Sequence, residues 1–402
     1  MESLDTHLTR RMAETEAAGL RRSLRRMENP LGTRIEFDGV PLINFASNDY
    51  LGLARHPVLI EAASRAARDW GAGSTASRLV CGSLGIFHEL EETLAAWKQA
   101  EAALVFSTGY ATALGAVPAL VGAGDVVILD KRVHACCVDA ARLSGARLRV
   151  FRHNDLDDLE RILIWARRPA GDAAPPAHIL IITESVFSMD GDHAPLRELV
   201  ELKERYGAWL MVDEAHAAGL LGTRRTGLVE ALNLSDHVDV QMGTLGKALG
   251  ASGGYIIGSN RLRDHLLNFA RSFVFSTAPV PAAAAAALAG VRLVAGPEGA
   301  ERVQRLGSRE DLFQSELRSS GFDLPAHPGA LFPLVAGAED EATGWSARLR
   351  VRGFLVPAIR FPTVARGAAR LRVTLTADHP EADIRDFTRA VVETRPQKVS
   401  PQ

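Results

Sequence analysis

The alternation of short apolar runs with helical stretches between residues 58 and 290 constrains the fold more than any other feature of the sequence. Seven runs of four or five mostly apolar residues recur in this region, separated by stretches such as 58–70, 84–98 and 196–206 that are typical of helices. The runs are 103–106, 126–129, 148–151, 179–182, 209–212, 238–242 and 254–257. Because strands buried on both faces read as nearly continuous apolar runs, the pattern predicts a large, mostly parallel sheet covered by helices, an α/β fold.

The segments before and after this region follow other patterns. Residues 1 to about 30 have spaced apolar positions that predict a helix, and Asp38-Gly39 between two alternating runs predicts a hairpin. After an alanine-rich helix, the pattern predicts a helix at 298–319, strands at 331–335 and 370–374, and a last helix at 380–392. The expected division is an N-terminal segment over residues 1–45, a large α/β domain over 46–290 and a small C-terminal α+β domain over 291–402.

The composition excludes several classes of protein. A net charge of −2 provides no broad electrostatic surface for nucleic acid or a membrane. Three cysteines without a CxxC pair indicate neither a disulfide framework nor a zinc site, so we expect no metal and assign the adjacent Cys136 and Cys137 to packing. The charged N-terminus is unlike a secretory signal, and the alanine-rich stretch at 278–294 contains two prolines and an arginine. We therefore expect a cytoplasmic protein without a membrane span.

Two strand ends carry candidate catalytic side chains. Asp213 directly follows the run at 209–212, at the end of a strand where open α/β sheets bind ligands, and His216 lies three residues further on. Lys247 follows the run at 238–242 and is preceded by two glycines, which allow a ligand to approach the backbone closely. A strand-end aspartate alone is about as often a turn residue, and a lysine alone is usually exposed, so the two together carry the signal.

The sequence around the lysine disfavours one alternative. A Walker A phosphate loop, GxxxxGK[ST], requires glycine at position 241 and serine or threonine after the lysine. The chain has Gln241 and Ala248 at these positions, and alanine cannot bind magnesium. A P-loop nucleotide site is therefore not expected.

An amine and a strand-end carboxylate are the two groups that pyridoxal phosphate (PLP) chemistry requires. The amine forms an imine with the cofactor, and the carboxylate keeps the pyridine nitrogen protonated so that the ring can accept electrons. Two unit charges about 4 Å apart at an effective dielectric of about 20 contribute roughly 4 kcal/mol, or about three pKa units. These requirements identify Lys247 and Asp213 as the central candidates for a PLP site.

The phosphate and the ring of the cofactor need further contacts. Gly109 and Tyr110 open a predicted helix after the run at 103–106, where free backbone amides and the helix dipole favour an anion. Hydroxyl groups are offered by Thr244, Ser276 and Thr277. His134 follows the run at 126–129 and can stack on the ring, although a single histidine is by itself more often structural.

Six motifs in this order resemble the α-oxoamine synthases, a branch of the fold-type I PLP-dependent transferases. The motifs are NFASNDYLG at 44–52, STGY at 107–110, VFSMDGD at 186–192, VDEAH at 212–216, GTLGK at 243–247 and FST at 275–277. The match extends from about residue 15 to 393, which is nearly the whole chain. It implies the fold-type I architecture, with a large domain around a mostly parallel seven-stranded sheet and a smaller C-terminal α+β domain. It also implies a homodimer with shared active sites.

The resemblance assigns roles to individual residues. Lys247 corresponds to the Schiff-base lysine and general base, Asp213 to the partner of the pyridine nitrogen, and His134 to the residue that stacks on the ring. The other expected cofactor contacts are His216 beside the ring hydroxyl, Gly109, Tyr110, Ser188 and Thr244, with Ser276 and Thr277 reaching the phosphate of the neighbouring subunit. The expected substrate contacts are Arg22, Asn48, Thr363 and, as the carboxylate clamp, Arg360. Arg21 and Arg25 stay open as alternatives to Arg22.

Within this family, residues 358–364 and 369–377 are most similar to the branch that works in biotin biosynthesis. That similarity implies a decarboxylative condensation of L-alanine with a pimeloyl thioester carried by coenzyme A or by an acyl carrier protein. The alternative is a relative that uses glycine with an acetyl, succinyl or long-chain acyl thioester. One departure is Phe361, which stands where the biotin branch usually has proline, next to the expected carboxylate clamp.

Overall fold

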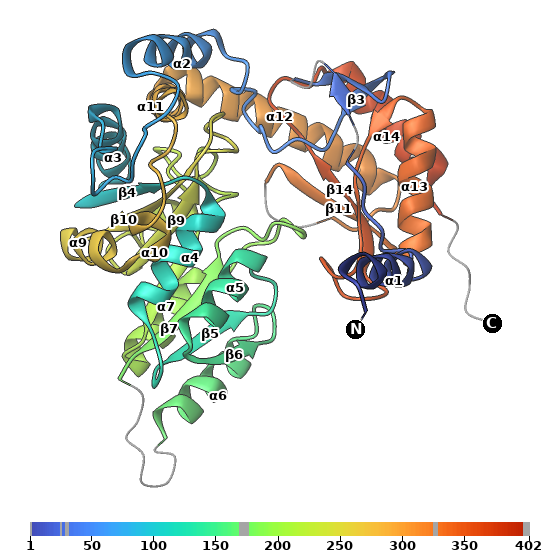
Figure 1. The fold of residues 1–402 in the computed structure, drawn as a ribbon. Helices are drawn as coiled ribbons and strands as arrows, with labels where there is room; N and C mark the ends of the chain where they lie inside the picture. Colours follow the sequence, from blue (N-terminus) through green and yellow to red (C-terminus); the bar gives the residue numbers. More distant parts are fainter. Residues whose placement is uncertain (1, 25, 29–31, 169–176, 325–328, 397–402) are drawn as a thin grey trace.

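The structure, a computed structural model, describes residues 2–24, 26–28, 32–168, 177–324 and 329–396. A seven-stranded sheet in the order β4-β10-β9-β8-β7-β5-β6 lies at the centre of the larger lobe (Figure 1). Its strands are β4 (Ala102–Phe106), β5 (Val126–Asp130), β6 (Arg147–Phe151), β7 (Ile179–Glu184), β8 (Trp209–Asp213), β9 (Val240–Thr244) and β10 (Gly254–Gly258). The strands from β9 to β6 pair in parallel, whereas β10 is antiparallel to both of its neighbours. The predicted sheet of seven mostly parallel strands is confirmed.

Helices cover both faces of this sheet. They are α2 (Pro57–Trp70), α3 (Gly85–Lys98), α4 (Gly109–Leu120), α5 (Ala135–Ser144), α6 (Leu156–Arg167), α7 (Leu196–Tyr206), α8 (Leu228–Ala231), α9 (Asn260–Phe269), α10 (Arg271–Val274) and α11 (Pro281–Ala295). In β5, Val126 and Ile128 are buried with residues of α6 and α7, while Val127 and Leu129 are buried with residues of α4, α5 and α9. Because both faces are dry, every position of the strand must be apolar, which explains the continuous runs in the sequence.

The smaller lobe combines the two ends of the chain. The long helix α12 (Pro297–Ser319) leads into it, and β11 (Leu331–Gly337), β14 (Ala369–Thr374) and β13 (Ala358–Ile359) form its three-stranded sheet (Figure 1). The predicted N-terminal hairpin is present as β2 (Arg34–Phe37) and β3 (Val40–Asn44), with β1 (Met27–Glu28) at its edge. Its strand β3 pairs in parallel with β12 (Phe354–Leu355). The smaller lobe is completed by α13 (Glu339–Val351) and α14 (Glu381–Thr394).

The first helix is shorter than the sequence pattern predicts. The predicted helix extends to about residue 30, but α1 spans only Leu4–Ala17. Gly19 adopts a φ of +66° and its N–H bonds the Glu16 carbonyl, a left-handed helix end that glycine tolerates without strain. No residue of α1 is buried, so its apolar positions do not pack into the core. Within the described ranges, none of the helices combines the length and the apolar character that a bilayer crossing requires.

Helix α11 packs so closely on the larger lobe that one position requires glycine. A Cβ added to Gly290 would lie 2.3 Å from the Leu249 carbonyl oxygen. We therefore expect Gly290→Ala to lower the free energy of unfolding by about 1–3 kcal/mol, because the backbone must shift to relieve the overlap. A Cβ on Gly307, within α12, meets no atom within 4 Å, so Gly307→Ala should instead raise it by up to about 1 kcal/mol through helix propensity. Denaturant unfolding of both variants measures whether their free energies of unfolding change in opposite directions. Equal changes in the two variants would contradict the expected overlap at Gly290.

Candidate active site

A chain of hydrogen bonds leads from Lys247 toward the smaller lobe. The Lys247 Nζ atom lies 2.8 Å from His216 Nε2, and His216 Nδ1 lies 2.6 Å from the Tyr50 hydroxyl. The same hydroxyl is 3.3 Å from Asn48 Oδ1, which also accepts a hydrogen bond from Arg372. Lys247 lies in the loop after β9 and His216 in the turn after β8, so two parallel strand ends bring them together. Tyr50 joins them from a loop more than a hundred residues earlier in the chain.

The ionisation states of these side chains fix the direction of the hydrogen bonds between them. Burial lowers the pKa of His216 well below its ordinary value, and the nearby Lys247 lowers it further. A neutral His216 can accept at Nε2 from the lysine and donate from Nδ1 to the Tyr50 oxygen. Burial also lowers the pKa of Lys247, although the Asp213 and Glu184 carboxylates raise it. The site therefore favours a lysine with an available lone pair, as imine formation requires.

Two carboxylates lie side by side at the ends of neighbouring strands. Asp213 ends β8, and its register partner on β7 is Glu184. Burial raises the pKa of Asp213, while Lys247 and the Ala215 N–H lower it. Burial, reinforced by the charge of Asp213, raises the pKa of Glu184 to about 8. Two carboxylates so close together favour a cation between or beside them.

Glu184 is a site residue that the sequence analysis missed. One of its oxygens accepts the Ser188 N–H at 3.0 Å, and the other, Oε1, is buried without a hydrogen-bond partner among the described residues. Ser188, an expected cofactor contact, is thereby held next to the strand end that carries Glu184, and its carbonyl oxygen accepts a hydrogen bond from Arg372 Nε at 2.6 Å. The available signal was the acidic residue at the end of the run beginning at 179, since parallel strands end at one edge of a sheet.

Backbone amides form an anion site at the start of α4. Gly109 and Tyr110 precede the first bond of the helix, from the Thr112 N–H to the Thr108 carbonyl, so their own N–H groups lie ahead of the ladder. A Cβ on Gly109 would lie 3.9 Å from Thr244 Oγ1, so the predicted threonine adjoins this helix end. The start of α4 and Thr244 at the end of β9 lie close together because the residue between them is a glycine. A Cβ atom on Gly254 would lie 2.7 Å from the Gly109 nitrogen. This arrangement suits a phosphate group.

His134 occupies the position before α5. Its Nδ1 atom accepts the Cys136 N–H at 3.2 Å and lies 3.0 Å from Cys136 Sγ, which fixes the ring's orientation. The hydrogen bond to Cys136 raises the pKa of His134, while burial opposes this change. The Asp213 and Glu184 carboxylates also raise it, which places the ring near the carboxylate pair. An exposed ring held in this way can cover a planar ligand.

The expected substrate contacts lie at the border of the smaller lobe. Arg360 Nη1 donates to the Gly19 carbonyl at 2.5 Å, so the expected carboxylate clamp contacts the segment that carries Arg22. The Thr363 N–H in turn bonds the Arg360 carbonyl at 3.0 Å. Arg22 is exposed, whereas Arg21 pairs with Glu16 at 2.8 Å, and Arg25 lies outside the described residues.

Three expected cofactor contacts are directed elsewhere in this single chain. The Tyr110 hydroxyl donates to the Asp139 carboxylate on α5, and its side chain is exposed. Ser276 and Thr277 lie in the segment between α10 and α11, where the Ser276 hydroxyl donates to the Thr277 carbonyl at 3.2 Å. Among the described residues, no hydrogen bond joins either of them to Lys247, His216 or Asp213. A role in another subunit's site therefore stays a prediction.

The residues present fit PLP. The donor set supplies an amine of lowered pKa, two buried carboxylates at adjacent strand ends, and a backbone anion site with a neighbouring hydroxyl. The unpartnered Glu184 Oε1 shows that one buried acceptor lacks a hydrogen-bond donor among the described residues. A cofactor that brings a phosphate, an aldehyde and a basic ring nitrogen would satisfy each of these groups.

His153 bridges two carboxylates and makes the stability of the protein depend on pH. Its ring nitrogens lie 2.9 Å from Asp130 Oδ1 and 2.6 Å from Asp192 Oδ2. Burial disfavours the charged ring, but the two carboxylates outweigh it and raise the pKa of His153 to about 9. The folded pKa lies above the ordinary value, so the stabilisation is complete below about pH 6.5 and is lost as the pH rises through about 9.

We therefore expect His153→Gln to destabilise the protein by on the order of 3 kcal/mol at pH 6 and by much less at pH 10. Denaturant unfolding at the two pH values measures the difference. The exposed pair of His237 with Glu204 provides the control, because a solvent-exposed ion pair contributes little. A His153→Gln defect that is the same at both pH values would contradict the assignment of a charged, doubly paired ring.

Comparison with known proteins places these features in a family. The model of the class I and II aminotransferases matches residues 40–391. A curated 8-amino-7-oxononanoate synthase from Geobacter sulfurreducens is 47% identical over 366 residues, which are 91% of this chain and 92% of that protein. The enzyme of the same name from Methylococcus capsulatus is 46% identical over 388 residues, 96% of this chain and 98% of that protein. Among solved structures, a serine palmitoyltransferase from S. paucimobilis with a bound PLP–myriocin aldimine superposes with a TM-score of 0.88 at 27% identity, covering 96% of both chains.

Proposed function

The chain belongs to the class I and II aminotransferase family, in its α-oxoamine synthase branch, and from this premise we propose how its site works. The enzyme is a PLP-dependent acyltransferase that condenses L-alanine with a pimeloyl thioester, with loss of carbon dioxide, to form 8-amino-7-oxononanoate in biotin biosynthesis. The observation that carries the residue assignment is the amine of Lys247, which burial keeps at a lowered pKa, 2.8 Å from His216.

PLP, when bound, supplies an aldehyde that captures an amino group and a ring that accepts electrons from the adjacent carbon. With PLP bound, Lys247 would hold it through Nζ and would serve as the base that takes the proton from the alanine Cα atom. His216 accepts a hydrogen bond from Nζ and so orients the amine toward that carbon. Asp213 holds a proton on the ring nitrogen, which offsets the unfavourable burial of its own charge.

The remaining assignments concern binding. The N–H groups of Gly109 and Tyr110, with the Thr244 hydroxyl, bind the phosphate, and His134 covers the ring. Ser188, in the turn after β7, is held by Glu184 and contacts the cofactor. The substrate carboxylates are bound by Arg22, Asn48, Thr363 and Arg360.

The assembly and the acyl carrier belong to the same proposal. We propose a homodimer in which Ser276 and Thr277 reach the phosphate of the neighbouring subunit, supported by the exposure of this segment, where Phe275 is 72% exposed. The pimeloyl group is carried by coenzyme A or by an acyl carrier protein. We also propose the cytoplasm as the compartment.

The substrate assignment is tested with purified protein and crossed substrates. We expect turnover with L-alanine and pimeloyl-CoA, measured as released thiol and as 8-amino-7-oxononanoate by mass spectrometry. Glycine with acetyl-, succinyl- or long-chain acyl-CoA should react at least about tenfold more slowly, since a misfit side chain or acyl chain is worth about 1–3 kcal/mol. A preference for glycine and a different acyl donor would overturn the assignment of substrates while leaving the reaction class intact.

A further inference from the structure

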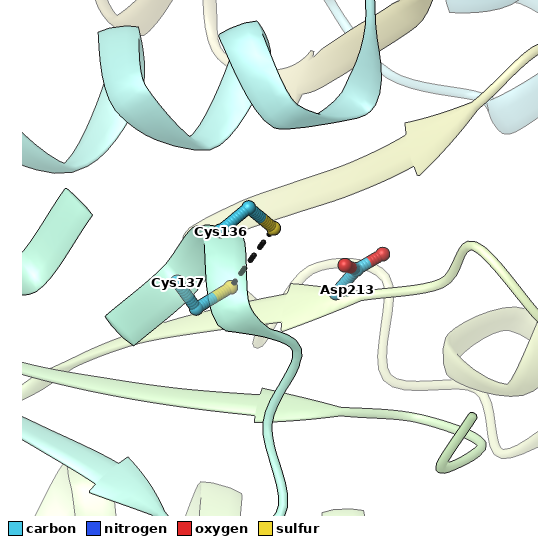
Figure 2. Close-up of side chains that lie close together, drawn as sticks. All are labelled: Cys136, Cys137 and Asp213. Atoms are coloured by element: carbon cyan, nitrogen blue, oxygen red, sulfur yellow. Dashed lines mark hydrogen bonds between the residues drawn. The ribbon is translucent and has the colours of Figure 1, made fainter. Parts of the chain in front are cut away.

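A second group of potential ligands includes Asp213, the proposed partner of the ring nitrogen. The sulfur atoms of Cys136 and Cys137 and a carboxylate oxygen of Asp213 all lie within 4.8 Å of one another, and all three residues are buried. Figure 2 shows the two sulfur atoms at the start of α5, on the side that faces the end of β8 where Asp213 lies. The sequence analysis assigned both cysteines to packing, and the mechanism proposed above does not use them.

The geometry matches a soft divalent cation. The two sulfur atoms are 4.0 Å apart. A tetrahedral zinc ion with Zn–S bonds of about 2.3 Å requires a separation of about 3.8 Å, so the thiols need to move only a few tenths of an ångström. Two thiolates and one carboxylate would leave a fourth position for water, as in zinc sites with three protein ligands.

The chemistry of the ligand atoms selects the class of cation. A thiolate is the form of cysteine that binds a metal, and soft sulfur ligands favour zinc-like cations over magnesium or calcium.

We propose that Cys136, Cys137 and Asp213 form a binding site for a thiophilic divalent cation such as Zn²⁺, and that this cation and the cofactor exclude each other. The exclusion rests on the proposed function, because it requires that Asp213 also face the ring nitrogen of PLP. A carboxylate that neutralises a metal ion no longer holds a proton on that nitrogen. Binding forms two metal–sulfur bonds and one metal–oxygen bond, and the thiols release their protons to solvent, so affinity should rise with pH.

Cation binding is measured first, with Cd²⁺ as the probe and the full-length protein freed of cofactor. We expect the ultraviolet charge-transfer absorbance of cadmium–thiolate bonds to appear with one cation per chain. Cys136→Ser and Cys137→Ser should each weaken binding at least tenfold. The third cysteine, Cys81, is exposed and lies outside the group, so Cys81→Ser is the matched control and should bind as the unmodified chain does. Absence of the band, or an equal loss in Cys81→Ser, would overturn the site.

The mutual exclusion of the cation and the cofactor is measured next on the holoenzyme. Addition of Cd²⁺ should decrease the visible absorbance of bound cofactor and release PLP to the filtrate, and a chelator should restore it. Cys137→Ser holoenzyme should keep its cofactor at the same cation concentration. Cadmium binding that leaves the cofactor absorbance unchanged would overturn the exclusion. If the unmodified chain showed no cofactor absorbance even without cation, the proposed function would fail, while the cadmium band would still decide the metal site.

Discussion

Replacement of Lys247 by alanine should abolish the reaction and the covalent attachment of the cofactor together. The variant loses both the amine that holds PLP and the base that removes the Cα proton, and base catalysis alone contributes about 10²–10⁴-fold, so we expect a loss of about 10⁴-fold or more in kcat. The buried position of the amine beside His216 is the structural reason. Turnover is measured as released thiol, and attachment by borohydride reduction followed by mass spectrometry of the peptide that contains Lys247.

The matched control for this variant is Lys203→Ala on α7. Lys203 donates to Asp239 at 3.2 Å and makes no hydrogen bond to Lys247, His216 or Asp213 among the described residues, so its loss should leave kcat within about twofold. Phosphate anchoring does not depend on the lysine, so Lys247→Ala should still bind PLP noncovalently. Retained turnover in Lys247→Ala, or a reduced label on another lysine, would refute the assignment of the amine.

Replacement of Asp213 by asparagine should separate activity from stability. Asparagine keeps the acceptor for the Ala215 N–H, which lies 2.9 Å from Asp213 Oδ1, but it cannot hold a proton on the ring nitrogen. A charge pair worth roughly 4 kcal/mol corresponds to about a 10³-fold loss in kcat. Steady-state assays of released thiol measure this loss.

The same substitution should stabilise the cofactor-free protein. Burial raises the pKa of Asp213, so keeping the carboxylate ionised costs free energy when no cation faces it. A group with a raised folded pKa contributes stability below its unfolded pKa and loses it as the pH rises, so the gain in stability from Asp213→Asn should be larger at higher pH. Thermal unfolding of cofactor-free Asp213→Asn at pH 6 and pH 8 tests this, with the exposed Asp236→Asn as control. A lower unfolding temperature for Asp213→Asn than for the unmodified chain would contradict it.

Local sequence patterns were sufficient for the sheet and for its functional edge. Each of the seven strands lies within two residues of a predicted run, because a strand buried on both faces needs an apolar side chain at every position. Asp213 and Lys247 were identifiable because each follows such a run by a few residues. The end of α1 just before Gly19 could also have been predicted, since a glycine after a helical pattern is a frequent helix end. The spacing of apolar residues instead led to a predicted helix that was too long.

Contacts across long sequence separations were decided only by the tertiary structure. The register that places Glu184 beside Asp213, the hydrogen bond from His216 to Tyr50 and the bond from Arg372 to the Ser188 carbonyl join segments with no shared pattern. The pairing of β3 with β12, which joins the two ends of the chain, is of the same kind. Periodicity reports which face of one element is buried, whereas the identity of the neighbour depends on how all elements pack, and the pKa values that make Lys247 reactive follow from that packing.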